Sequence, residues 1–250
     1  MFQTVFANVP SRIKNRFRFA VLILLAIVGA SGVDAQSSGL KHTVSVRELQ
    51  ISSKAKANFQ RGLQRLLKQD AEGSLKHFAA AIEAAPNFSE AFYHQGVAEA
   101  QLSRNEEALG SFQAAIDLSE GHDPRAEFGY ALVLCRVGSA IEAESVVRHG
   151  MQADADTPDG HIVLALILLK LNRVEEAERS AQQALLLKQP GSAKARLILA
   201  DIKGVRRDFE GQANELNEYL KTYPDAPNRN FLKTVRDTAK KLAVEDSNRP

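Results

Sequence analysis

The sequence predicts an all-α protein, an α-α superhelix of about five helix-turn-helix repeats that ends in a capping helix. Two observations support this fold class. Among the 250 residues there is no Trp, only 6% are aromatic, and Ala and Leu recur throughout. A core of small side chains suits closely packed helices better than a β-sandwich. The second observation is a repeat with a measurable period.

The repeat becomes visible when the chain is aligned with itself. A row of small residues recurs at intervals of 34, 35, 34 and 35 residues: Gly62, Gly96, Ala131, Ala165 and Ala200. The rows that begin at Ser74, Phe78, Ala81 and Ile82 keep the same spacings. We interpret each unit as a pair of helices that cross at the small residues, because only Gly or Ala lets two backbones approach closely.

The N-terminus has the pattern of a secretory signal peptide, residues 1–35. Four basic residues within 1–18 precede a 12-residue apolar run, Phe19 to Ala30, and small residues follow. A membrane-spanning helix needs about 20 residues, so we expect cleavage, after Ala35 as first choice or after Ala30. No cysteine lies near either position, which excludes a lipoprotein anchor. The expected location is the periplasm or the medium, by the general export route.

Export also accounts for the charge of the chain. The full sequence has 32 basic and 30 acidic residues, a formal charge of +2. Residues 1–35 hold four of the cations and one of the acids, so the mature chain keeps 28 basic and 29 acidic residues, a formal charge of −1. The mature protein is therefore near neutral, and apolar recognition is favoured over charge.

After a lead-in at residues 36–52, we expect five units at 53–86, 87–121, 122–156, 157–190 and 191–224. Asn87 is predicted to cap the second unit. Asp123-Pro124 and Thr157-Pro158 open the third and fourth with a cap and a first-turn proline.

The remaining segment, 225–250, should hold the capping helix, because a solenoid needs a terminal element with one polar side. We place this helix at Asn228 to Leu242 and a frayed tail at Glu245 to Pro250. Its apolar face is expected to comprise Phe231, Leu232, Val235, Ala239 and Leu242.

The repeat resembles the tetratricopeptide repeat (TPR), whose period is about 34 residues. Its phrases are QRGLQRLLKQDAEGSLKHFAAAIEAAPN in the first unit and AFYHQGVAEAQLSRNEEALGSFQAAIDL in the second. The resemblance runs from Ser53 to Pro224 and implies a right-handed solenoid. Ser74, Gln212 and Tyr219 depart from the usual small residues. The VSVRELQI lead-in followed by such repeats is similar to exported TPR proteins of soil bacteria, which indicates a family but no activity.

The resemblance implies a binding groove lined by the first helix of each pair. The inward positions form an apolar and aromatic ladder: Phe59, Leu63, Tyr93, Val97, Phe128, Leu132, Ile162, Leu166 and Leu197, with Asp201 at a polar end. Such a groove suits an apolar strand or an amphipathic helix of a protein partner. Relatives that grip a C-terminal carboxylate use Lys and Asn at these positions, so a carboxylate clamp is not expected. The alternative is that several of these residues only pack between helices.

The lead-in itself is a candidate occupant of the groove. From His42 to Ile51 it carries Val44, Val46 and Leu49. It could act as an intramolecular plug, and the simpler alternative is a tail that packs beside the first unit.

No catalytic or cofactor motif is found in the sequence. Cys135, the single cysteine, falls inside a predicted helix and should be a buried, inert thiol. The cluster from Asp154 to His161 lacks the closing glutamate of a calcium loop, since Ala165 stands there. The histidines outside this cluster, His42, His77, His94 and His122, lack metal-ligand spacing and should lie at the surface. Basic residues alternate with acidic ones, so no nucleic-acid partner is expected.

The leading hypothesis is therefore an exported, non-catalytic adaptor that binds a protein partner through its groove and touches the membrane only through its signal. One alternative is a membrane-tethered assembly subunit of the cell envelope, in which the signal is not cleaved. A weaker alternative is an accessory subunit of an enzyme.

Overall fold

A computed structural model describes residues 51–120, 122–153 and 157–248. Within these ranges the chain forms eleven α-helices, one 3₁₀ turn and no strand, which confirms the all-α fold class. The predicted signal peptide, both cleavage positions and most of the lead-in fall outside the described residues.

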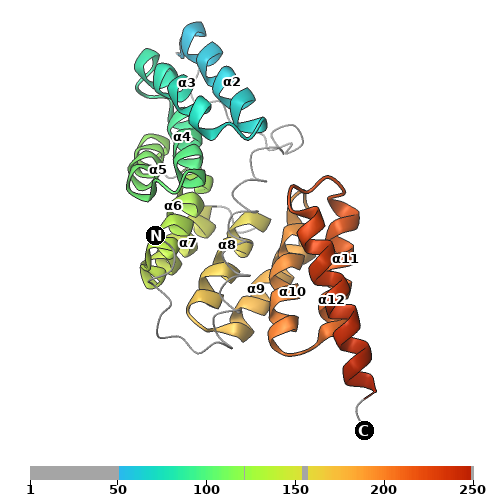
Figure 1. The fold of residues 1–250 in the computed structure, drawn as a ribbon. Coiled ribbons are helices and arrows are strands. Elements are labelled where there is room, and N and C mark those ends of the chain that lie inside the picture. The colour runs from blue at the N-terminus through green and yellow to red at the C-terminus, as the bar shows by residue number, and fades with distance from the viewer. Residues whose placement is uncertain (1–50, 121, 154–156, 249–250) are drawn as a thin grey trace.

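The helices occur in consecutive pairs, one pair in each predicted unit (Figure 1). Their bounds are α2 Ser53–Leu67, α3 Ala71–Ala84, α4 Ser89–Gln101, α5 Asn105–Ser119, α6 Pro124–Val137, α7 Ala140–Ala153, α8 Pro158–Lys170, α9 Val174–Leu186, η2 Ser192–Lys194, α10 Ala195–Val205, α11 Phe209–Thr222 and α12 Arg229–Ser247. We call the first helix of each pair (α2, α4, α6, α8, α10) the A helix and the second the B helix.

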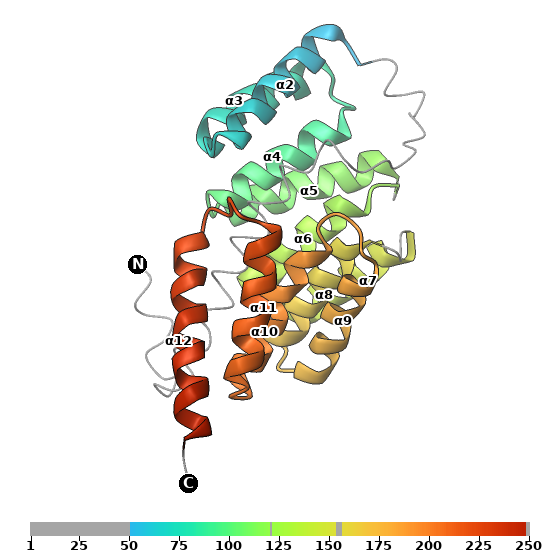
Figure 2. The same ribbon diagram turned by 90° about the vertical axis from the view of Figure 1, so that its right-hand side faces the viewer.

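Successive pairs pack side by side along an arc, with α2 at one end and α12 at the other (Figures 1 and 2). Each A helix contacts its own B helix and the B helix of the unit before it. The result is the superhelical solenoid that the period predicted. Among the described helices, none is both long and apolar enough to span a membrane.

Within a pair, a small residue on the A helix faces a larger one on the B helix. A Cβ placed on Gly62 of α2 would lie 2.5 Å from Cε1 of Phe78 on α3, and one on Gly96 would lie 2.9 Å from Cδ1 of Phe112 on α5. In the third and fourth units the A-helix residue at this position is Ala. Its counterpart on the B helix is smaller than Phe: Val147 in the third unit and Ala181 in the fourth. The two rows therefore compensate each other in size.

The turn between the A and B helices is also repeated. One residue of each turn has a positive φ, and these residues again follow the spacings of 34 and 35: Gln69, Ser103, Gly138, Asn172 and Arg207. Asp70 and Asp208 then cap the following B helices by accepting hydrogen bonds from backbone amides at 2.8 Å. Every unit thus makes the same tight reversal with a different residue.

The predicted helix starts are partly correct. Asp123 caps α6 by accepting from the amide of Arg125 at 3.1 Å. Thr157 occupies the cap position of α8 but its side chain makes no capping bond. Asn87 is not a cap: α4 begins at Ser89, after Phe88. Phe88 is buried and its ring packs 4.9 Å from that of Phe59, so core packing decides where this helix begins.

The capping helix is longer and its buried face is narrower than predicted. The helix α12 continues to Ser247, so the predicted tail at Glu245 is helical. Leu232 and Ala239, seven residues apart, are buried against the solenoid, whereas 41% of Phe231 is exposed. Phe231 lies one residue, and so about 100°, round the helix from Leu232.

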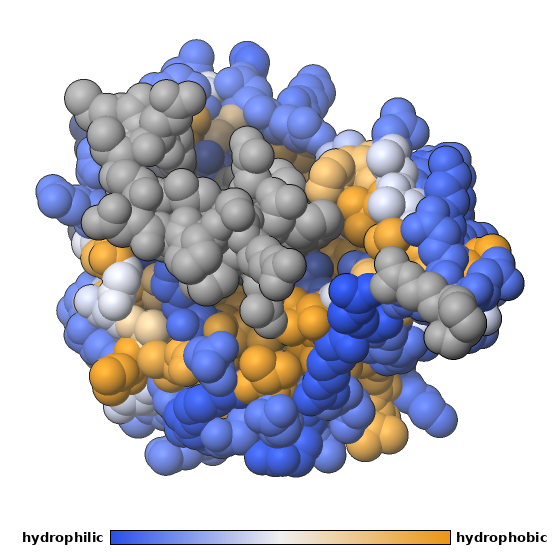
Figure 3. Space-filling model, turned by 60° about the horizontal axis from the view of Figure 1, so that its bottom comes forward, coloured by the Kyte–Doolittle hydropathy of each residue, from blue (hydrophilic) through white to orange (hydrophobic). Residues whose placement is uncertain are grey.

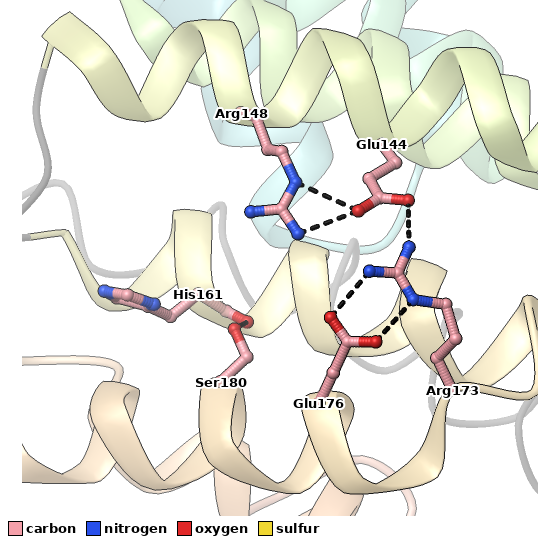
Figure 4. Close-up of polar contacts among 6 residues, drawn as sticks. All are labelled: Glu144, Arg148, His161, Arg173, Glu176 and Ser180. Atoms are coloured by element: carbon pink, nitrogen blue, oxygen red, sulfur yellow. Dashed lines mark hydrogen bonds and ion pairs between the residues drawn. The ribbon is translucent and has the colours of Figure 1, made fainter.

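Ion pairs join neighbouring units away from the A helices. Glu144 of α7 accepts from Arg148 at 2.8 Å and from Arg173, at the start of the next B helix, at 2.6 Å (Figure 4). Arg173 also holds Glu176 through two hydrogen bonds of 2.6 Å. Because every charge in this cluster is paired, we assign it a role in holding units together and no role in chemistry.

Candidate protein-binding groove

The predicted groove residues all lie on A helices, two on each of α2, α4, α6 and α8 and one on α10. The structure places most of them deeper than an open groove requires. The buried ones, none of them more than 7% exposed, are Phe59, Val97, Phe128, Leu132, Ile162, Leu166 and Leu197. Only Leu63 and Tyr93 are half-exposed. The ladder is thus mainly packing between units, with a more open part near Tyr93.

Phe128 illustrates the packing role. A Cβ on Gly150 of α7 would lie 3.0 Å from its ring, and one on Gly160 of α8 would lie 2.9 Å away. The ring therefore fills the space that two glycines leave between the third and fourth units. Ile162 and Leu166 belong to an apolar run on α8 that is buried without a break from 162 to 168.

Four predicted residues meet in one small pocket. Tyr93 and Val97 come from α4 and Phe128 and Leu132 from α6, with Phe112 of α5 beside them. The pocket has a volume of about 50 Å³, and we call it the Tyr93 pocket. It is built by the A helices of three successive units, because α8 adds Asp159 and Val163 to its wall. The structure does not bring Phe59, Leu63, Ile162, Leu166 or Leu197 into it.

The rim of the Tyr93 pocket is held by Arg125. Its guanidinium donates two hydrogen bonds to Asp123, at 2.8 and 2.7 Å, and lies 3.7 Å from Glu90. It also sits over the Tyr93 ring, 5.1 Å from the centroid. Burial lowers the pKa of Arg125, but the bonded Asp123 carboxylate outweighs burial, so its pKa is raised. Burial raises the pKa of Tyr93 to about 12, so the phenol is neutral.

The charged residues of this rim were not predicted from the sequence, although they belong to a regular pattern of charges in it. Three residues before the first predicted inward position of each A helix stands a charged residue, and the sign alternates along the solenoid: Lys56, Glu90, Arg125, Asp159 and Lys194. Neighbours in this row approach each other, since Arg125 is 3.7 Å from Glu90. Asp159 and Lys194 both come within 3.8 Å of the point where Gly191 would carry a Cβ. These charged residues do not appear when only the apolar rows of the repeat are compared.

The histidine prediction is wrong for His94. Its ring lies among aromatic rings that link the first two units, 5.4 Å from Phe59, 6.0 Å from Phe78 and 4.9 Å from Tyr93. Its Nδ1 is buried and, among the described residues, finds no hydrogen-bond partner. Burial lowers the pKa of His94 to about 3, with a smaller effect from Arg125. The imidazole is therefore neutral.

The polar end of the ladder is Asp201 on α10, in the row of Leu63, Val97 and Leu132. Burial raises the pKa of its carboxyl to about 7. Its side chain is thus partly protonated near neutral pH, and this end of the A-helix surface carries less negative charge than the sequence suggests.

Cys135, metal-ligating side chains and the calcium-like cluster are the remaining candidates for chemistry. Cys135 is buried on α6 as predicted, and burial raises the pKa of its thiol. Within the described ranges, no group of three or more His, Cys, Asp or Glu side chains could hold a metal ion. Asp154 and Asp156 of the calcium-like cluster lie outside the described residues.

Apolar surface gathers on one face of the molecule. Figure 3 shows hydrophobic residues in the middle of the lower face, bordered by hydrophilic ones.

Comparison with known proteins shows which family this chain belongs to. The family profile of the tetratricopeptide repeat matches residues 59–134 and 162–227, together more than half of the chain. The chain belongs to the tetratricopeptide repeat family. A search of curated proteins found no match.

Solved TPR structures share the fold of this TPR chain. A thermophilic TPR protein of Thermus thermophilus is 18% identical, with 74% of this chain and 98% of that one covered and a TM-score of 0.66. PilW, a type IV pilus biogenesis factor, is 17% identical (77% and 88% covered, TM-score 0.62). MamA from Desulfovibrio magneticus, from residue 41 to its end, is 19% identical (71% and 99% covered, TM-score 0.53). At these identities the likeness shows the fold alone, that of a scaffold which suits binding to other proteins.

Proposed function

We propose that this TPR protein is an exported, non-catalytic adaptor that binds a protein partner through the A-helix face of the solenoid. The observation that carries the proposal is the Tyr93 pocket. It is an apolar hollow shared by three successive units, in which four of the predicted groove residues converge. A site that spans several units reads an extended or helical segment better than a compact small molecule.

The size of the pocket defines the partner's anchor. A water needs about 10–15 Å³ of such volume, so a pocket of about 50 Å³ accepts a side chain of three or four carbons. A valine, a proline or the end of a leucine fits, and an aromatic ring does not. The rim charges of Arg125 and Asp123 already satisfy each other. Binding should therefore depend weakly on salt, unlike binding by an electrostatic clamp.

A non-catalytic role agrees with the chemistry of the described side chains. The thiol of Cys135 is 3% exposed and its pKa is raised, which is the opposite of an activated nucleophile. The contact of Glu127 with His149, 2.9 Å long, joins α6 to α7, and among the described residues no hydroxyl or thiol is bonded to this pair.

The test of the groove is replacement of Tyr93, because its ring is half-exposed and forms one wall of the pocket. We expect Tyr93→Ser to abolish capture of the partner from the exported fraction, measured by pull-down and mass spectrometry, while circular dichroism stays unchanged. Phe128 is unsuitable for this test, since its ring supports two neighbouring helices.

Ile141→Ser is the matched control. Ile141 is an apolar residue on α7 that is 80% exposed and lies outside the pocket. Capture should survive this substitution. If Ile141→Ser removes the same proteins as Tyr93→Ser, or if neither does, binding does not run through the pocket.

Export has a separate test, the N-terminal mass of the native protein. We expect a chain that begins at Gln36, or at Ser31 for the second cleavage position. A chain that keeps Met1 in the membrane fraction would instead support the tethered assembly subunit.

A further inference from the structure

One position breaks the apolar row that runs through the Tyr93 pocket. Val97 of α4 and Leu132 of α6 line that pocket, and Leu63 and Leu166 hold the same position in the first and fourth units. In the fifth unit the position is occupied by Asp201 of α10. The row to which the pocket residues belong therefore ends in an acidic side chain.

Asp201 has no partner within the described part of the chain. It is half-buried, yet no described residue donates a hydrogen bond to its carboxylate or forms an ion pair with it. The two cations that α10 itself carries are bound elsewhere, because Arg196 and Lys203 donate to Glu215 of α11 at 2.7 and 2.9 Å. The carboxylate has therefore lost part of its hydration without gaining a contact.

The charged groups of neighbouring elements do not compensate for this burial. Four elements pack against α10, namely α8, α9, η2 and α11. The charged side chains that they bring close to α10 or to its start are Asp159, Glu178, Lys194 and Glu215. None of these groups shifts the pKa of Asp201, which burial alone raises to about 7.

A positively charged ligand accounts for an aspartate at this position. An unpaired, half-buried carboxylate is unfavourable, and the leucine that other units carry in this row would avoid the cost. A cation beside Asp201 would stabilise its charged form. A metal ion is not favoured, because no group of three or more His, Cys, Asp or Glu side chains in the described ranges could hold one. Lysine and arginine combine a positive charge with an apolar stem, which suits a row that is otherwise aliphatic.

We propose that Asp201 forms an ion pair with a lysine or arginine of the protein partner, in the segment whose apolar side chain enters the Tyr93 pocket. The A helices α4, α6 and α8 build the pocket and Asp201 lies on α10, so the cation lies on the α10 side of the apolar anchor. This inference rests on the proposed function and adds to it the class of residue that the partner must carry.

The carboxyl group of Asp201 is open to direct observation by carboxyl-carbon NMR of the full chain, with its signal assigned from its loss in Asp201→Asn. The probe is n-butylammonium, the free form of a lysine side chain. It should lower the pKa of Asp201 by about 1 pH unit, because an adjacent cation stabilises the carboxylate. Sodium chloride and n-butanol at the same concentration should not. The internal control is the carboxyl group of Asp225, which is exposed. An unchanged pKa at Asp201, or an equal fall at Asp225, would overturn the proposal.

Partner capture provides a second measurement. Asp201→Asn keeps the shape of the side chain without its charge and should reduce capture by about tenfold or more at pH 8. Capture by the unsubstituted chain should rise about tenfold from pH 6 to pH 8, because the charged fraction of a carboxyl group with a pKa of about 7 rises by that factor. Asp201→Asn should show no such rise, and Asp225→Asn should behave as the unsubstituted chain.

The two measurements separate this inference from the proposed function. If n-butylammonium lowers the pKa of Asp201, and both Asp201→Asn and Tyr93→Ser lose capture, both hold. If Tyr93→Ser loses capture and Asp201→Asn does not, the groove function stands and the ion pair with Asp201 is wrong. If n-butylammonium lowers the pKa but no chain captures a protein, the cation site at Asp201 stands and the adaptor function is wrong.

Discussion

At the scale of single residues, His94 is the least expected feature of this protein. It occupies an A-helix position whose equivalents in other units include Gly129 and Val163, and it is surrounded by rings. A buried Nδ1 with no partner among the described residues is costly, since the nitrogen has given up water without gaining a hydrogen bond from them. Because the His94 ring contacts that of Tyr93, this energetically unfavourable nitrogen lies next to the wall of the Tyr93 pocket.

His94 should make stability depend on pH. Its pKa is about 3 in the folded chain and about 6.5 when unfolded, so between these values only the unfolded chain takes up a proton. The His94 contribution to stability is therefore complete above pH 6.5 and falls as the pH drops, by up to about 1.4 kcal/mol per pH unit. Asp201 contributes in the opposite direction, because its carboxyl has a pKa raised to about 7 in the folded chain. His94→Leu should remove the His94 contribution to the pH profile and raise stability at pH 7 by about 1 kcal/mol. Urea unfolding between pH 4 and pH 7 measures both effects.

His122→Leu is the control for this measurement, because His122 is exposed. Its pH profile should follow that of the unsubstituted chain. A His94→Leu profile that also stays parallel to it would mean that the imidazole is not held neutral in the folded protein.

At the scale of helices, the fit between A and B helices depends on paired sizes. Phe78 approaches Gly62 so closely that no Cβ can be added without movement of the ring. The same holds for Phe112, which meets both Gly96 and Gly129. In the first two helix pairs the spacing is therefore set by one glycine and one aromatic ring.

The same substitution at two glycines should have opposite effects. Gly62→Ala should destabilise the protein by about 1–3 kcal/mol through overpacking. Gly110→Ala should stabilise it by about 1 kcal/mol, because Gly110 lies in α5 with no atom near its Cβ direction and Ala favours helix. Thermal unfolding of the two variants measures the difference.

A second substitution tests the cause. Phe78→Leu, combined with Gly62→Ala, should recover part of the loss because the smaller side chain leaves room for the new methyl group. If Gly110→Ala also destabilises the protein, contact with the Phe78 ring is not the reason for the loss in Gly62→Ala. The same holds if the stability losses of Gly62→Ala and Phe78→Leu simply add in the double variant.

At the scale of the whole molecule, the core is divided along the solenoid. One buried cluster unites residues from α6 to α12, and a separate cluster unites residues of α2, α3 and α4. Between them lies a small cluster around Phe112 and Val133. The α12 helix covers the C-terminal end of the stack, whereas the described helices include none that covers the outer side of α2. Stability should therefore be uneven along the chain.

Hydrogen exchange should reveal this gradient. In a solenoid each unit is stabilised only by its neighbours, so the first unit is expected to open before the rest. Amides of α2 and α3 should exchange at least tenfold faster than those of α8, where Ile162 to Leu168 are all buried. Uniform protection across α2, α3 and α8 would show that the solenoid unfolds as one cooperative unit.

Much of this architecture was predictable because it follows from a repeat in the sequence. Spacings of 34 and 35 residues identified the A helices, the B helices and their small crossing residues. Capping at Asp123 was also predictable, since it involves a residue and its near neighbours. The start of α4 was not, because burial of Phe88 against Phe59 depends on a contact between units.

The sequence by itself determined the repeat, the helix pairs and the set of inward residues, because periodicity depends only on neighbours along the chain. Only the tertiary structure decided which inward residues are packing and which form a pocket. Ile162 and Leu166 are covered by adjacent helices and lie outside the pocket, while Tyr93 keeps an open side that Arg125 borders. Burial depends on how closely successive A helices approach, and that approach is set by contacts between residues far apart in the sequence.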